Sequence, residues 1–145
     1  MSVFLDSGLF YALQNECASR HDMAKAAFET VLGPEYGPLF TSDYVFDETV
    51  TLVRARAGSY DEARTVADRI LGRGAFPSAI DCLVTDQADF ERAVDTFERY
   101  DDHDLSFTDA TTIALVETRA IDHVLAFDDD FDGIVDRLDP ARLVE

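Results

Sequence analysis

The stretch Ser2-Val3-Phe4-Leu5-Asp6-Ser7 decides the fold of this chain. Its three central apolar residues do not alternate with polar ones, which is typical of a strand buried on both faces of a parallel sheet. An apolar pattern of helical spacing begins at Leu9, directly after this run. A strand that leads straight into a helix places Asp6 at the carboxyl edge of the sheet, where ligands bind in open α/β folds.

The rest of the chain alternates short apolar runs with longer amphipathic segments. Further strands are predicted within residues 39–41, 76–84 and 121–127, and a weak last strand within 135–144. Helices are predicted over 9–13, 21–32, 43–56, 60–71, 86–97 and 108–119. This alternation predicts an α/β fold in which a central parallel sheet of about four to five strands is flanked by helices. The chain has the length of one domain, which we expect to span residues 1–145.

Acidic residues dominate the composition. The chain has 30 Asp and Glu residues against 12 Lys and Arg residues, a net charge of −18. At molar salt the Debye length falls to about 3 Å and the self-repulsion of such a surface is screened. We interpret the charge as an adaptation to a high-salt, halophilic cytoplasm. A nucleic-acid backbone would be repelled by this surface, except at a local basic patch or through metal ions.

No apolar run approaches the length of a membrane span, and no signal-peptide pattern is present. We therefore expect a cytoplasmic protein without a membrane partner. The two cysteines, Cys17 and Cys82, have no metal-type spacing, and we expect both to be reduced thiols.

Two carboxylates directly follow predicted strands. Asp6 ends the first strand, and Asp128 ends the fourth, at the head of an acidic run that includes Asp129, Asp130 and Asp132. The carboxyl ends of parallel strands meet at one edge of a sheet, so both residues are expected at the same edge. Other roles are open for both: Asp6 can cap the following helix, and the acidic run can be solvated surface.

Two further carboxylates lie on the inner faces of predicted helices. Glu48 is three residues after Val45 and four before Leu52, which places it on the apolar stripe of its helix. An ionised carboxylate buried there is costly unless it binds a cation or pairs with an arginine. Asp109 leads the stripe of the helix 108–119, although a capping-box pair with Ser106 is an alternative role.

Carboxylates that converge on one edge of a sheet repel one another and raise one another's pKa values. Divalent cations bound among them would remove this conflict. Mg²⁺ prefers oxygen ligands, and two such ions can activate water and stabilise a leaving oxygen in phosphodiester cleavage. The pattern therefore favours a magnesium-type site.

Four segments carry these acids, namely Phe4-Leu5-Asp6-Ser7, Thr41-Ser42-Asp43-Tyr44-Val45 leading to Glu48, Leu105-Ser106-Phe107-Thr108-Asp109-Ala110, and Ala126-Phe127-Asp128-Asp129-Asp130-Phe131. In this order, and over essentially the whole chain, they resemble the acidic motifs of PIN-domain ribonucleases. Within that family the chain is most similar to the VapC-type toxins of type II toxin–antitoxin pairs.

The resemblance implies a PIN-like fold and a metal-dependent endoribonuclease that cleaves structured RNA such as transfer or ribosomal RNA. It also implies a homodimer that is silenced by a small antitoxin protein. Catalytic roles carry over to Asp6, Glu48, Asp109 and Asp128. The three aspartates are expected to bind Mg²⁺ or Mn²⁺, and Glu48 to be a ligand or to position the attacking water.

A hydroxyl residue often accompanies these acids in the family, and Ser7, Ser106 and Thr108 are candidates here. Ala126 is a departure, because many relatives have Thr or Ser two residues before the fourth acid. This departure leaves open whether Asp128, or instead Asp130 or Asp132, supplies the fourth ligand.

Residues 54–73 contain five arginines against three acids, a positive stretch in an acidic chain. Arg54 and Arg56 are predicted to bind RNA phosphates, since arginine makes bidentate phosphate contacts. Pairing with surface acids, or contact with the antitoxin, is an equally simple role for these arginines.

Two other functions compete with a nuclease. One is a catalytically weak or inactive PIN-fold module that binds RNA or protein, which the departure at Ala126 favours. The other is a magnesium-dependent phosphatase, but Asp6 is followed by Ser7 and Gly8 rather than by an Asp-x-Asp motif.

Overall fold

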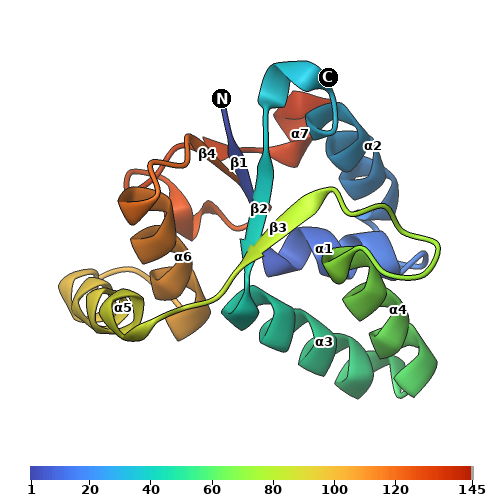
Figure 1. Ribbon diagram of the computed structural model, residues 1–145, viewed down its shortest axis with the longest axis horizontal. Coiled ribbons are helices and arrows are strands. Elements are labelled where there is room, and N and C mark those ends of the chain that lie inside the picture. The colour runs from blue at the N-terminus through green and yellow to red at the C-terminus, as the bar shows by residue number, and fades with distance from the viewer. Residues whose placement is uncertain (145) are drawn as a thin grey trace.

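Five parallel strands form the centre of the computed structural model, which describes residues 1–144 (Figure 1). They are β1 (Val3–Leu5), β2 (Leu39–Ser42), β3 (Ile80–Leu83), β4 (His123–Leu125) and β5 (Arg137–Leu138), in the spatial order β3-β2-β1-β4-β5. All three residues of β1 are buried, as its unalternated apolar pattern predicts for a central strand. The predicted α/β fold with four to five parallel strands is confirmed.

The helices between the strands begin and end at residues suited to those positions. They are α1 (Ser7–Gln14), α2 (His21–Val31), α3 (Asp43–Ala57), α4 (Tyr60–Leu71), α5 (Gln87–Arg99), α6 (Phe107–Thr118) and α7 (Pro140–Leu143), with 3-10 turns at Pro34–Tyr36 and Asp129–Phe131. The Ser42 and Ser59 hydroxyls cap the N-termini of α3 and α4. Gly58 and Gly72 end the same helices at φ +63° and +67°, a left-handed conformation that glycine adopts without steric cost.

Helices cover the sheet on both sides. In Figure 1, α5 and α6 lie on one side of the strands, and α1, α2 and α4 lie on the other. Going from β1 to β2 to β3 the chain moves one way across the sheet, whereas β4 returns to the opposite side of β1. The gap beyond the carboxyl ends of β1 and β4 is therefore the topological switch point, where open α/β sheets bind their ligands.

The last predicted strand is only partly correct. The sequence predicts a weak strand within 135–144, but the structure has the two-residue β5 followed by helix α7. Pro140 explains the change, because its fixed φ suits the first turn of a helix and it cannot donate to a strand. The Asp139 side chain then accepts the N–H of Ala141 and caps α7.

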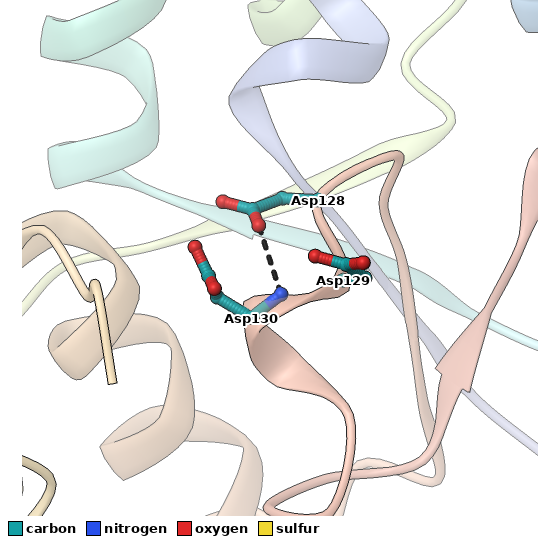
Figure 2. A group of neighbouring side chains, drawn as sticks. All are labelled: Asp128, Asp129 and Asp130. Atoms are coloured by element: carbon teal, nitrogen blue, oxygen red, sulfur yellow. Dashed lines mark hydrogen bonds between the residues drawn. The ribbon is translucent and has the colours of Figure 1, made fainter. Parts of the chain in front are cut away.

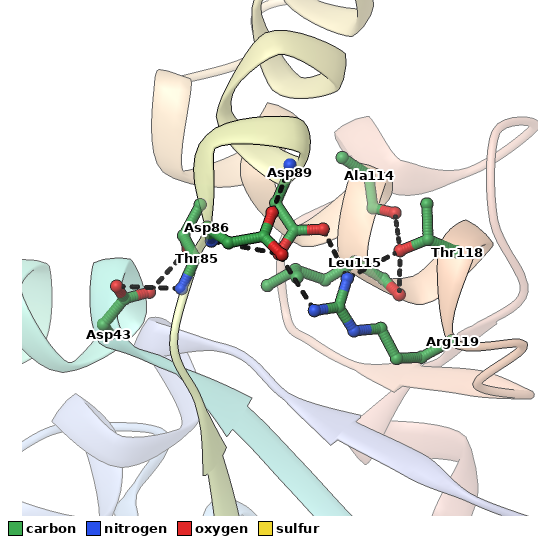
Figure 3. A network of polar contacts seen from close by, with 8 residues as sticks. All are labelled: Asp43, Thr85, Asp86, Asp89, Ala114, Leu115, Thr118 and Arg119. Carbon is green, nitrogen blue, oxygen red and sulfur yellow. Dashed lines mark hydrogen bonds and ion pairs between the residues drawn. The ribbon is translucent and has the colours of Figure 1, made fainter.

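Polar contacts, shown in Figure 3, and aromatic contacts attach α5 to α6. Arg119, at the end of α6, forms a two-pronged ion pair with Asp89, in which Nη2 lies 2.9 Å from Oδ2. Asp86 caps α5 by accepting the N–H of Asp89 at 2.8 Å. At the other end of α6, the ring of Phe107 lies 5.6 Å from that of Phe90. These contacts fix the start of α6 beside the carboxyl edge of the sheet.

Within residues 1–144, the helices are too short or too polar for any of them to cross a membrane.

Candidate metal centre

An open acidic pocket lies at the switch point of the sheet. Seven carboxylate side chains and one arginine line it, together with Ser7, Gly8, Leu105, Ser106 and Phe127. The charged residues are Asp6, Arg20, Glu48, Asp104, Asp109, Asp128, Asp129 and Asp130. The structure thus brings the four acids of the sequence motifs to one place. Asp6 directly follows β1, Asp128 lies three residues after the end of β4, which is shorter than predicted, and Glu48 and Asp109 lie in the N-terminal halves of α3 and α6.

Asp6 is the deepest of these acids, with 4% of its surface exposed. Its backbone occupies the N-cap position of α1, but its side chain makes no capping hydrogen bond. Its Oδ1 atom is buried without a hydrogen-bond partner. The Asp6 side chain therefore does not cap α1, and one of its oxygens is a buried acceptor without a hydrogen-bond partner among the described residues.

Asp109 forms the capping box considered for it and also lines the pocket. It is 7% exposed. Its Oδ2 accepts the N–H of Ser106 at 3.0 Å, while its own N–H donates to Ser106 Oγ at 3.1 Å. This capping box fixes the start of α6 and uses one carboxylate oxygen, so the helix cap also orients Asp109 in the pocket.

Glu48 lies differently from its predicted position. The buried stripe of α3 is Val45, Thr49 and Val53, whereas Leu52 is half-buried. Glu48 lines the pocket from the margin of that stripe. Among the described residues it has no arginine or lysine partner within 4.0 Å. The salt-bridge role considered for Glu48 is therefore not realised in residues 1–144.

Asp128, Asp129 and Asp130 surround a tight turn, and each offers an oxygen within 4.8 Å of the others (Figure 2). Asp128 Oδ1 accepts the backbone N–H of Asp130 at 2.9 Å, which orients the Asp128 carboxylate. Ala126 is fully buried and offers no polar side chain to this acid. The turn itself therefore supplies the polar contact to Asp128 that the Ala126 side chain lacks.

Asp132 is engaged elsewhere. Arg137 donates to both of its oxygens, at 2.8 and 3.1 Å, and the same guanidinium donates to the Ala126 carbonyl at 2.9 Å. The hydrogen bond from Arg137 lowers the pKa of Asp132. Of the two neighbours considered as alternatives to Asp128, Asp130 lies in the pocket and Asp132 does not line it.

Burial and mutual repulsion shift the pKa values of the pocket acids. Desolvation, then the charge of Asp109, raises the pKa of Asp6 to about 8. Desolvation is also the main cause that raises the pKa of Asp109 to about 6, with Asp128 and Glu48 adding repulsion. The charge of Asp128 raises the pKa of Asp130. Without a cation, the pocket disfavours the fully ionised state of its own carboxylates.

This donor set fits a hard divalent cation. All the candidate ligands are carboxylate oxygens, which Mg²⁺ and Mn²⁺ prefer, and the orphaned Oδ1 of Asp6 is the buried acceptor that a cation would satisfy. A cation near Asp6 and Asp109 would also remove the repulsion that raises their pKa values. The tightest group of oxygens is Asp128–Asp130, rather than the predicted set of Asp6, Asp109 and Asp128. We favour the predicted set of Asp6, Asp109 and Asp128 as ligands. Asp129 is exposed, whereas Asp6 is buried and has an acceptor oxygen without a partner among the described residues.

The three candidate hydroxyl residues differ in whether they line the pocket. Ser7 and Ser106 line the pocket, whereas Thr108 is not among its lining residues. The predicted RNA-binding residues Arg54 and Arg56 occupy the last turn of α3, outside the pocket, and are exposed. Arg56 lies over the ring of Tyr11, 5.4 Å from its centre.

Sequence reasoning missed two charged residues of the pocket, Arg20 and Asp104. Asp104 lies directly before the Leu105-Ser106 segment of the third acidic motif, and this closeness could have indicated that Asp104 belongs to the pocket. Arg20 lies in the turn before α2, and its position offers no such signal, because only the packing of α1 and α2 brings it to the sheet edge.

Comparison with known proteins decides the family. A model of the PIN domain matches residues 3–136 of the chain. The 23S rRNA-specific endonuclease VapC20 of Mycobacterium tuberculosis is 30% identical over 130 residues, which cover 89% of this chain and 91% of that protein. The chain belongs to the PIN-domain family, in its VapC group. The predicted resemblance is confirmed.

Solved structures also match this VapC-type chain. The crystal structure of M. tuberculosis VapC20, described as a Sarcin-Ricin loop cleaving toxin, matches with a TM-score of 0.78 and 28% identity, covering 92% of this chain and 96% of that one. VapBC2 from Rickettsia felis, bound to a DNA fragment from its promoter, matches with a TM-score of 0.71 over 96% and 98% of the two chains. At 10% identity, that second match shows the shared fold alone.

Proposed function

We propose that this VapC-type PIN domain is a divalent-metal-dependent endoribonuclease, the toxin of a toxin–antitoxin pair. One observation carries the proposal: four motif acids meet at the switch point of a PIN fold, and the most buried of them has an oxygen without a hydrogen-bond partner in residues 1–144. The similarity to an rRNA endonuclease over most of both chains supports RNA as the substrate.

The four acids have two kinds of task in this proposal. Asp6, Asp109 and Asp128 hold Mg²⁺ or Mn²⁺, with Asp109 fixed by the capping box and Asp128 by the Asp130 N–H. Glu48 is a further ligand or orients the attacking water by accepting its proton. When bound, the cation lowers the pKa of a water molecule and offsets the charge of the scissile phosphate. Ser7 and Ser106 line the same pocket and can donate hydrogen bonds to a phosphate oxygen.

The substrate and partners follow from the same relatives. We propose a structured RNA, such as a loop of ribosomal or transfer RNA, because the similar VapC20 is named as specific for 23S rRNA. A small antitoxin protein is the expected partner, since toxin–antitoxin complexes share the fold. We further propose a homodimer of single-domain subunits that acts in the cytoplasm.

The Asp109→Asn variant tests the proposed reaction. Wild-type protein in molar KCl with Mg²⁺ or Mn²⁺ is expected to cut ribosomal or total RNA, and Asp109→Asn to lose this activity by about 10²-fold or more. Asparagine keeps an oxygen to accept the Ser106 N–H, so α6 stays capped while the charge is removed. Gel analysis of the RNA fragments, with and without EDTA, measures the effect.

The exposed Asp95→Asn in α5 is the matched control, because it removes the same charge away from the pocket, and it should retain full activity. Equal fragments from wild type and Asp109→Asn would mean a contaminating nuclease. RNA binding without any cleavage would instead favour an inactive PIN-fold binding module, the alternative that the departure at Ala126 suggests. Hydrolysis of small phosphate esters but not of RNA would favour a phosphatase.

The two arginines at the end of α3 can be tested separately. The double variant Arg54→Ala/Arg56→Ala is expected to weaken RNA binding several-fold and leave Mn²⁺ binding intact, because both side chains are exposed and lie outside the pocket. The double variant Arg64→Ala/Arg73→Ala is a control of equal charge change, since both of those arginines pair with Asp68. Equal RNA affinity of the Arg54/Arg56 variant and wild type, in filter binding, would remove these residues from the RNA surface.

A further inference from the structure

Arg20 is the basic residue of the acidic pocket. It lies in the turn between α1 and α2, at the N-cap position of α2, far along the sequence from the acids of α6 and the β4 end. Its side chain lines the same hollow as seven carboxylates, and no other lining residue is basic. The fold thus places a guanidinium among the groups to which we assign the phosphodiester chemistry.

The guanidinium is held by a ring rather than by an acid. Its central carbon lies 4.7 Å from the centre of the Phe127 ring, and Phe127 directly precedes Asp128. Among the described residues, Arg20 has no ion pair within 4.0 Å and no side-chain hydrogen bond. A cation that stacks on an aromatic face is fixed in its plane while its N–H donors stay free.

Arg56, Arg69 and Arg99 also lie over aromatic rings, but none of them lines this pocket. Two arginines near acids behave differently from Arg20. Arg119 and Arg137 each hold a carboxylate through two nitrogens. Arg20 shares its pocket with seven acids and holds none of them. Arg20 therefore does not neutralise the pocket carboxylates by direct ion pairing.

We propose that Arg20 binds a phosphodiester group of the RNA backbone at the mouth of the pocket and positions it over the carboxylates. This inference rests on the proposed nuclease function. The planar fork of the guanidinium matches two non-bridging phosphate oxygens, a contact that a lysine cannot reproduce. The contact also offers the polyanionic substrate an attractive group in a pocket that otherwise repels it. Phe127 acts as a positioning residue by supporting the guanidinium.

RNA binding should be measured in the Asp109→Asn background, so that cleavage does not interfere. Adding Arg20→Ala is expected to weaken the affinity for single-stranded RNA about tenfold. It should also reduce the slope of log affinity against log salt by about 0.7, the value for one lost phosphate contact. Arg20→Lys should recover the slope but only part of the affinity. Arg92→Ala, an exposed change of equal charge on α5, should alter neither.

Two further measurements separate this role from a structural one. In the otherwise wild-type enzyme, Arg20→Ala should raise KM more than it lowers kcat, and Mn²⁺ affinity should be unchanged or higher because a nearby positive charge is lost. An unchanged affinity and salt slope, with a lower melting temperature, would show that Arg20 only stabilises the acidic pocket and would overturn the proposal. An equal loss in Arg92→Ala would overturn it too, as an effect of net charge.

The test also distinguishes failure of this inference from failure of the proposed function. If wild type cleaves RNA with metal and Arg20→Ala has the same kcat/KM, only the role of Arg20 is wrong. If wild type neither binds nor cleaves RNA, both proposals are wrong.

Discussion

The Asp6→Asn variant is expected to lose RNA cleavage and to gain stability in the absence of metal. The carboxylate is buried, one of its oxygens has no hydrogen-bond partner in the described part of the chain, and desolvation and the charge of Asp109 raise its pKa to about 8. Asparagine has nearly the same shape without the charge, so it removes both the ligand and the cost of burying it. We expect cleavage to fall by about 10²-fold or more.

The gain in stability should depend on pH in a defined direction. Because the folded-state pKa of Asp6 lies above its ordinary value of 3.8, its contribution to stability is fully present below about pH 4 and is lost as the pH rises through 8. The asparagine of the variant does not ionise and has no such loss. In EDTA, the variant should therefore exceed wild type at pH 8 by about 2–4 kcal/mol in the free energy of unfolding, and by much less at pH 5.

Urea unfolding in molar KCl at pH 5 and pH 8 measures this difference, with Asp95→Asn as the control that should match wild type at both. Mn²⁺ at about ten times its dissociation constant should stabilise wild type by about 1.4 kcal/mol and leave Asp6→Asn almost unchanged. A variant that is less stable than wild type at pH 8 would show that the Asp6 carboxylate is satisfied within the protein. In that case Asp6 would need no cation.

Arg119→Ala is expected to cause the largest loss of stability in the chain outside the apolar core. Asp89 is 5% exposed, and Arg119 binds both of its oxygens where α5 begins and α6 ends (Figure 3). Removing the guanidinium leaves a buried charge without its partner, which costs about 3 kcal/mol. The exposed Arg92→Ala on the same helix pair should change stability by less than about 0.5 kcal/mol.

The pH dependence of this effect has the opposite sign to that of Asp6. The hydrogen bond from Arg119 lowers the pKa of Asp89, so the stability it provides is present above the ordinary pKa of aspartate and is lost as the pH falls through the folded-state value. The difference between wild type and Arg119→Ala should be full at pH 7 and shrink at pH 3. A constant difference across this range would assign the loss to packing of the arginine stem.

The position of α6 makes this stability relevant to the site. The Asp89–Arg119 pair and the contact of Phe107 with Phe90 both hold α6 against α5. Asp109 lies in the first turn of that helix. Loosening α6 should therefore lower metal affinity as well as stability, although Arg119 does not line the pocket.

The amino-acid sequence alone predicted a parallel sheet, six of the seven helices and the order of the four motif acids along the chain. All three residues of Val3–Leu5 are buried, because both faces of an unalternated apolar strand are hydrophobic and neither is suited to contact water. Ser42, Gly58 and Gly72 set helix ends through their own backbone and capping preferences. These are local properties, and similar ones place Asp6 directly after β1 and Asp109 in the first turn of α6.

Tertiary structure decided what surrounds those acids. Arg20 reaches the pocket only because α1 and α2 pack where they do, and no local pattern records that distance. The buried stripe of α3 runs through Thr49 rather than Leu52, since the neighbouring helices select which flank of an amphipathic helix is covered. Arg137 donates to both oxygens of Asp132, which does not line the pocket. Arg20 is far in sequence from most of the acids that line the pocket with it, so only the folded chain brings these charges together.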